Sequence, residues 1–147
     1  FFYYDKVIEE HQKMGRYLKA AFIAKDKMEA MARAQNVLLE GWRKNSDAFN
    51  CLNNYFANIK NLDLLQVEFK AIYEQEVNDK NANTFLRIIK YEFKKQNTLA
   101  PYLRTIAYEI IAQQAPFNPS IIQQLAVFNK GDKNISKDIL RYSHKRR

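Results

Sequence analysis

Residues 4–42 read YDKVIEEHQKMGRYLKAAFIAKDKMEAMARAQNVLLEGW, and apolar side chains recur in this segment at every third or fourth position. This spacing places the apolar residues on one face of an α-helix. Lysine, arginine and glutamate fill the opposite face, and no proline interrupts the segment. The pattern predicts one long N-terminal helix over residues 5–43, or a helix that breaks near Gly15 or in the polar patch at residues 25–27.

Further helical patterns follow along the chain. Each begins at Ser, Thr, Asp or Asn, whose side chains cap helix N-termini, and a proline stands in the first turn of two of them. The asparagine-rich run 78–83 is typical of a loop, and no alternation of period two persists for the length of a strand. The sequence therefore predicts an all-α fold, a single-domain helical bundle of six or seven helices over residues 1–147. The expected starts of the later helices are Ser46, Asp63, Thr84 or Asn83, Thr98, Asn118 and Ser136.

Size and composition agree with a folded domain. The chain has 147 residues, 47% of them hydrophobic and 27% charged, which suits a buried core rather than disorder. Its longest plain apolar run, residues 20–24, is far shorter than the ~20 residues that cross a bilayer. We therefore expect a soluble protein without a transmembrane segment, and an intracellular location is favoured. Because the sequence begins with Phe1 instead of Met, we also expect it to be a piece of a longer chain.

The positive charge lies in one half of the chain. There are 24 basic and 16 acidic side chains, which gives a net charge of +8. Residues 1–80 contain 12 of each sign, whereas residues 81–147 contain 12 basic and 4 acidic side chains. A one-sided positive field attracts polyanions such as nucleic acid or anionic lipid. The alternative explanation is a base-composition bias that enriches Lys, Asn, Phe and Tyr.

Helical spacing gathers these cations into two ridges, one on the fourth helix and one on the last. Residues three and four apart share a helix face, and a basic face can contact phosphates without reading bases. The candidate nucleic-acid-binding residues are Arg87, Lys90, Lys94, Lys95, Lys137, Arg141, Lys145, Arg146 and Arg147.

Two further patterns in the basic half are compatible with nucleic acid. Residues 121–142 follow the outline of a helix-turn-helix around Gly131, although any two short helices joined by a glycine turn have the same pattern. Aromatic side chains near cations can stack single-stranded bases, and helical amphipathicity explains most of the tyrosines here equally well. These tyrosines are Tyr91, Tyr102, Tyr108 and Tyr142.

Metal and catalytic chemistry are not indicated. The nitrogen and sulfur ligands His11, Cys51 and His144 are scattered, whereas a structural zinc needs about four ligands at short spacings. Cys51 lies next to the apolar face of the second predicted helix, where a free cysteine behaves as a small hydrophobe. The three glycines are isolated, so the chain has no glycine-rich phosphate loop. We therefore predict no metal, no cofactor and no enzymatic activity.

Our first hypothesis is a non-enzymatic helical binding domain whose basic half contacts a polyanion, nucleic acid in the first place, through its phosphates. The alternative is a protein-interaction or adaptor domain of a larger regulator or surface protein. It would dock on a protein partner, or on a second copy, through the amphipathic N-terminal helix. An enzyme is the third option, and a pocket that gathers polar side chains with perturbed pKa values would favour it.

Overall fold

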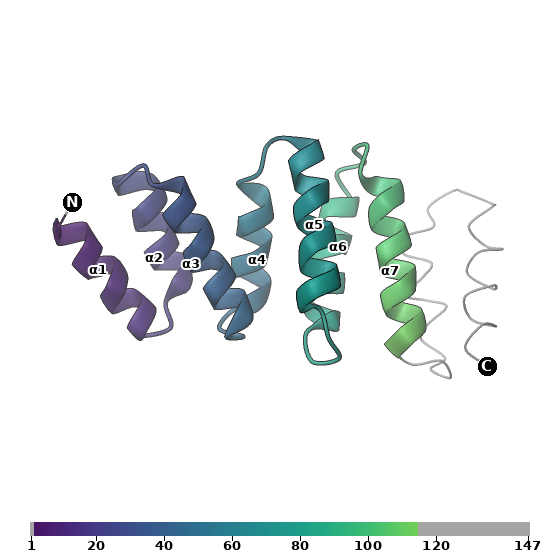
Figure 1. Ribbon diagram of the computed structural model, residues 1–147, viewed down its shortest axis with the longest axis horizontal. Helices are drawn as coiled ribbons and strands as arrows, with labels where there is room; N and C mark the ends of the chain where they lie inside the picture. The colour runs from purple at the N-terminus through teal and green to yellow at the C-terminus, as the bar shows by residue number, and fades with distance from the viewer. Residues whose placement is uncertain (1, 115–147) are drawn as a thin grey trace. The chain divides into compact units, whose positions relative to one another are not determined.

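A computed structural model describes residues 2–114, and every regular element among them is a helix (Figure 1). The predicted all-α class is confirmed, and this part of the chain contains no strand. The helices predicted to start at Asn118 and Ser136 lie outside the described residues. The elements are α1 Phe2–Lys13, α2 Tyr17–Phe22, the π-helical segment η1 Ile23–Lys27, α3 Met31–Arg43, α4 Ala48–Ala57, α5 Leu62–Glu76, α6 Ala82–Phe93 and α7 Ala100–Gln114.

The N-terminal apolar segment is not one long helix, which corrects the prediction for residues 5–43. The backbone enters the left-handed region first at Gly15, with φ 76°, and again at Glu29, with φ 51°. The first break lies where the glycine predicted it, and the second directly follows η1 and the polar patch at residues 25–27. The apolar stripe therefore folds back on itself, because α2 packs against both α1 and α3.

A Schellman motif ends α1 and explains why the break needs a glycine. The Arg16 N–H donates to the His11 carbonyl at 2.8 Å. The Gly15 N–H donates to the Gln12 carbonyl at 3.0 Å. This motif places its C′ residue in the left-handed conformation, which glycine adopts without a steric penalty.

Ser46 does not cap the second predicted helix, which is a further correction. It follows Asn45 (φ 55°) at the end of α3, and its N–H donates to the Gly41 carbonyl at 3.0 Å. Its hydroxyl donates to the Gly15 carbonyl at 2.9 Å. Ser46 therefore links the end of α3 to the end of α1, and α4 begins two residues later, at Ala48.

The described residues divide into two compact units, and the division falls within the sequence of α5: the first unit ends at Phe69 and the second begins at Lys70. In the first unit, α2, α3 and α4 approach closely at Gly41. A Cβ atom on Gly41 would stand 2.5 Å from Cys51 Sγ and 2.9 Å from Tyr17 Cβ. The core of this unit is closed by side chains that are at most 4% exposed: Ile8, Tyr17, Ala20, Ala24, Ala34, Val37, Leu38, Trp42, Cys51, Leu52, Phe56, Leu65 and Phe69.

Glu40 connects three helices of the first unit through its carboxylate. Gln12 Nε2 donates to it at 3.0 Å and the Tyr17 hydroxyl donates to it at 3.4 Å. Lys44 Nζ pairs with the same carboxylate at 3.0 Å, and this hydrogen bond raises the pKa of Lys44. Arg33 of α3 also pairs with Asp5 of α1. These hydrogen bonds and ion pairs orient α1 against α2 and α3.

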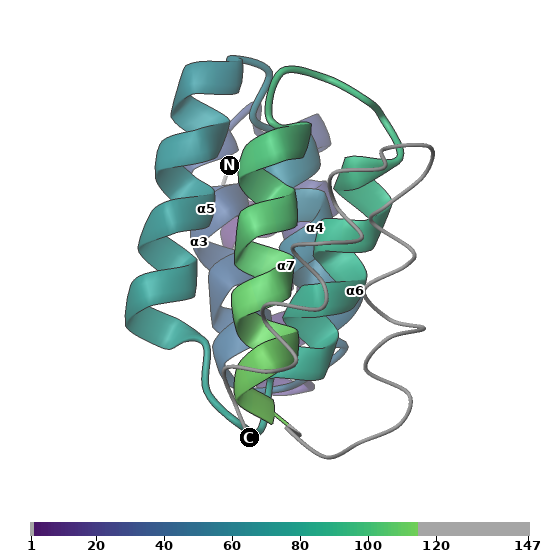
Figure 2. The same ribbon diagram turned by 90° about the vertical axis from the view of Figure 1, so that its right-hand side faces the viewer.

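The second unit contains the end of α5 together with α6 and α7, and Figure 2 shows α6 and α7 side by side. Tyr73 of α5 stacks on Phe85 of α6, with ring centroids 6.2 Å apart. The predicted asparagine loop is confirmed before α6, where Asn78 Oδ1 accepts the N–H groups of Lys80 at 2.8 Å and Asn81 at 3.2 Å. No helix within residues 2–114 has the length and apolar composition needed to cross a bilayer.

Candidate functional site

Helix α6 has one buried and one exposed face, and the predicted basic residues lie on the exposed one. Its buried residues include Phe85, Leu86 and Ile89. Arg87 and Lys94 are exposed, and Lys90 between them is partly exposed. This periodicity is that of an amphipathic helix, so packing of the apolar face forces the cations outward. We call the surface formed by Arg87, Lys90, Tyr91, Lys94 and Lys95 the α6 face.

Tyr91 is the aromatic member of the α6 face. Its side chain is 51% exposed, and it lies four residues after Arg87 and three before Lys94. Side chains at these spacings are neighbours on a helix, about 5–6 Å apart at Cβ. Lys95 Nζ lies 5.6 Å from the centroid of the Tyr91 ring. The tyrosine is therefore surrounded by cations on the solvent side of the helix.

Lys95 is held in place by a buried carboxylate. Its Nζ pairs with Glu92 Oε2 at 3.0 Å, and Glu92 is only 4% exposed. Lys90 and Lys94 form no ion pair with any described residue. Arg104 of α7 is half-buried, and its guanidinium lies 5.9 Å from the centroid of the Phe93 ring. The α6 face thus keeps two lysines available for an anionic partner.

The second predicted ridge cannot be placed beside the first. Its members Lys137, Arg141, Lys145, Arg146 and Arg147 lie outside the described residues, as does the helix-turn-helix outline at residues 121–142. The structure therefore brings together Arg87, Lys90, Lys94 and Lys95.

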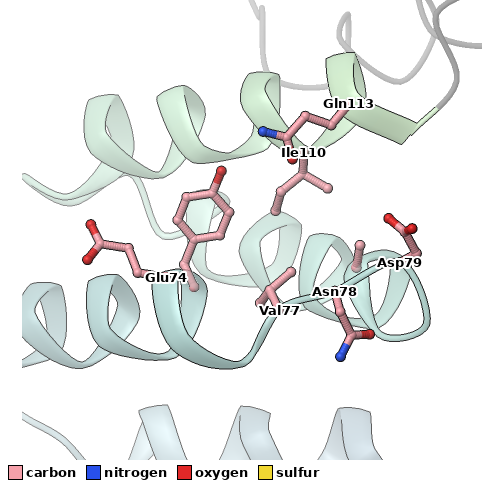
Figure 3. Close-up of a pocket in the computed structure, with 8 residues that line it drawn as sticks. Glu74, Val77, Asn78, Asp79, Ile110 and Gln113 are labelled. Atoms are coloured by element: carbon pink, nitrogen blue, oxygen red, sulfur yellow. The ribbon is translucent and has the colours of Figure 1, made fainter.

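A pocket of about 370 Å³ lies in the same unit, between the end of α5, the loop after it and α7 (Figure 3). Val77 and Ile110 face each other across it, and Glu74 and Asp79 stand at its two ends. Gln113 of α7 and Asn78 of the loop add amide groups. The pocket has an apolar middle and acidic ends, a charge opposite to that of the α6 face.

The phenols near this pocket are held in their protonated form. The Tyr73 hydroxyl donates to Glu109 Oε2 at 2.7 Å, and burial followed by this bond raises the pKa of Tyr73 far above its ordinary value of 10. Burial and the charge of Glu74 also raise the pKa of Tyr102. A raised tyrosine pKa disfavours the phenolate, which is the nucleophilic form, and the Tyr73 hydroxyl acts as a hydrogen-bond donor.

Burial also disfavours the ionised form of Cys51, the candidate nucleophile of the first unit. Cys51 is fully buried, and burial raises the pKa of its thiol to about 11. The thiolate is the reactive form of cysteine, so this environment suppresses its chemistry. No group of three or more His, Cys, Asp or Glu side chains within residues 2–114 is placed to hold a metal ion.

The N-terminal stripe, which the alternative hypothesis uses as a docking face, supplies the core of the first unit. Ile8, Leu38 and Trp42 are at most 3% exposed, because α1, α2 and α3 cover one another's apolar faces. Part of the same stripe does reach solvent, at Met14, Phe22 and Met31, and Phe2 and Tyr3 at the start of α1 are also exposed.

Sequence reasoning did not identify the acidic pocket or the Lys95 and Glu92 pair. Glu74 and Asp79 come from opposite ends of a helix-to-loop transition, and Ile110 and Gln113 join them from α7. The only local signal was the run of carboxylates at residues 74–79, which is typical of solvated surface.

No family model, no curated protein and no solved structure matches the chain. Its residues and their geometry therefore carry the functional conclusion.

Proposed function

We propose that the chain is a non-catalytic helical binding domain that contacts nucleic acid through phosphates, with the α6 face as the contact surface within the described residues. The observation that carries this proposal is the arrangement of Arg87, Lys90 and Lys94 along the solvent side of one helix. Every charged side chain on that side of α6 is basic. The second predicted ridge, with Lys137 and Arg141, lies outside the described residues and is not part of this observation.

Phosphate contact is the chemistry that such a face supports. Lysine and arginine that neutralise phosphates release condensed counterions, which supplies binding free energy without sequence information. The proposed binding is therefore tolerant of sequence and strongly dependent on salt. The protonated state of Tyr73 and Cys51 supports the non-catalytic part of the proposal, because neither group is poised as a nucleophile.

The test is a salt titration of affinity with the full chain and a fluorescein-labelled 20-nucleotide DNA, single-stranded and as a duplex, followed by fluorescence anisotropy. The logarithm of affinity should fall linearly with the logarithm of salt concentration. The variant Arg87→Gln/Lys90→Gln/Lys94→Gln should bind more weakly. Its salt slope on the duplex should be shallower by up to about 2.7, since each phosphate contact contributes about 0.9.

A matched control removes the same charge elsewhere. Lys19, Lys27 and Lys60 are exposed residues of the first unit, and the variant Lys19→Gln/Lys27→Gln/Lys60→Gln has the same net charge as the α6 variant. It should keep the wild-type slope. Absence of binding at low salt, a flat salt slope, or equal losses in the two variants would show that the α6 face is not a nucleic-acid contact.

We infer a second candidate function, contact with another protein or a second copy of the chain, from the exposed apolar side chains of the first unit. Met14 is 63% exposed and Phe22 is 58% exposed. Apolar side chains of this size left in water can mark an interaction surface. Light scattering of the wild type and of Met14→Ser/Phe22→Ser tests self-association: a dimer that dissociates in the variant supports this function, and a monomer in both removes its homo-oligomeric form.

A further inference from the structure

The four tyrosines of the basic half have different environments where the structure describes them. Tyr108 is 4% exposed and belongs to the core, and Tyr102 is half-buried near Glu74 and Glu109. Tyr142 lies outside the described residues. Tyr91 is different, since half of its side chain is in solvent and basic residues surround it. Of the three described tyrosines, it is the one that a nucleic acid bound to the α6 face would meet.

We propose that the α6 face binds single-stranded nucleic acid in preference to duplex, with one base stacked on Tyr91 and the adjoining phosphates on Arg87, Lys90 and Lys94. This inference rests on the proposed function and names its substrate class. An exposed aromatic ring within a cationic groove or ridge is the combination by which proteins bind single strands without reading sequence. In a duplex the bases are already stacked on one another, so Tyr91 offers a duplex no equivalent contact.

The position of Lys95 supports this assignment. Its ammonium lies 5.6 Å from the Tyr91 ring centroid and is anchored by Glu92, whose carboxylate is buried in the unit. The lysine is thereby kept beside the ring. A base stacked on the free side of the ring would bring its phosphates near Arg87 and Lys94, which lie at i−4 and i+3 of Tyr91 on the same helix face.

The experiment compares Tyr91→Ala and Tyr91→Phe with the wild-type chain on single-stranded and duplex DNA of the same length. Tyr91→Ala should lower single-strand affinity by about 5- to 150-fold, the loss that corresponds to one stacked base. Its salt slope and its duplex affinity should stay at wild-type values, because no phosphate contact is removed. Tyr91→Phe should keep most of the single-strand affinity, since it retains the ring.

Tyr3→Ala is the matched control, because Tyr3 of α1 is 71% exposed and lies outside the α6 face. It should change neither affinity. The stacking inference would be overturned if the wild type bound single-stranded and duplex DNA with equal affinity and Tyr91→Ala left the single-strand affinity unchanged. This result would leave phosphate binding intact. Failure of the wild type to bind either single-stranded or duplex DNA would overturn the proposed function itself. Circular dichroism of each variant should match the wild type, since Tyr91 is not a core residue.

Discussion

Replacing Gly41 by alanine should destabilise the first unit, although the same change in an open helix stabilises. Gly41 lies within α3, where alanine is favoured over glycine by about 1 kcal/mol. The added methyl would stand 2.5 Å from Cys51 Sγ, 2.9 Å from Tyr17 Cβ and 3.1 Å from Tyr17 Cγ. Two of these three separations are shorter than real Cβ contacts, so α2 or α4 must move away from α3.

The size of the destabilisation by Gly41→Ala depends on whether the atoms next to the added methyl group can move. Tyr17 Cβ is bonded directly to the backbone of α2, and Cys51 is 0% exposed, so neither atom can swing into free space. Overpacking of a filled core costs about 1–3 kcal/mol. After the helix-propensity gain of about 1 kcal/mol is subtracted, the expected net loss is up to about 2 kcal/mol for Gly41→Ala.

Urea unfolding followed by circular dichroism at 222 nm measures this loss as a lower midpoint at unchanged slope. Two controls separate the helix-propensity term from the steric term in this loss of stability. Asn36 is an exposed residue of the same helix, so the difference between Asn36→Ala and Asn36→Gly calibrates the propensity term alone. Adding Cys51→Ala to Gly41→Ala removes the sulfur contact and should recover part of the loss. A Gly41→Ala variant as stable as the propensity term predicts would refute the close approach of the three helices.

Three further predictions concern the backbone turn and the buried titratable groups. Gly15→Ala should lower the free energy of unfolding by about 1–2 kcal/mol, the cost of a left-handed non-glycine residue, and thermal unfolding should show Gly15→Asn less affected. The Cys51 thiol should resist iodoacetamide at pH 8 in the folded protein and react once urea unfolds it, because its pKa is about 11; rapid alkylation of the folded chain would contradict this burial. Tyr73→Phe should cost about 1–3 kcal/mol by leaving Glu109 without its donor. The pKa of Tyr73 is raised in the folded state, so its contribution to the free energy of unfolding is complete below pH 10 and is lost as the pH rises further. Above pH 10 the free energy of unfolding should therefore fall less steeply in Tyr73→Phe than in the wild type.

The periodicity of the sequence predicted which residues are buried better than it predicted where helices end. Leu38 and Trp42 were placed on the apolar stripe of a single helix, and both are core residues although the stripe is divided among α1, α2 and α3. Periodicity records which side chains avoid water, and this is unchanged when a helix folds back on itself. The break at Glu29 directly follows the polar patch at residues 25–27, so composition indicated it, whereas the apolar periodicity runs through both breaks.

Capping residues also show that a local sequence pattern does not determine where a helix begins or ends. Ser46 precedes an apolar run, as an N-cap does, yet its hydroxyl bonds the Gly15 carbonyl, 31 residues earlier in the chain. The next helix was expected to start at Asp63, yet α5 begins at Leu62 and Asn61 caps it by accepting the Leu64 N–H at 3.0 Å. A local pattern shows that a polar side chain can satisfy a helix end, and only the tertiary structure determines which end it satisfies.

The candidate site, too, could be predicted only in part from the sequence. Residue spacing alone placed Arg87, Lys90 and Lys94 on one side of a helix, and the packing of Phe85 and Ile89 shows that this side faces solvent. Spacing could not distinguish Tyr91 from Tyr108, because both follow basic residues at helical intervals. Burial distinguishes them, since Tyr108 is needed by the core and Tyr91 is not.

The net charge of +8 is therefore a poor measure of what a polyanion would meet in the second unit. Glu74 and Asp79 flank a pocket lined by Ala82, a buried residue of α6, whereas the cations occupy the exposed face of the same helix. Opposite charges on different sides of one helix create a directional field, and on the proposed function this field would orient an approaching polyanion as well as attract it. If total charge alone governed binding, neutralising Glu74 and Asp79 would strengthen it as much as removing two lysines from α6 weakens it. A contact made by the α6 face requires these two changes to be unequal, because only the lysines release counterions from the bound phosphates.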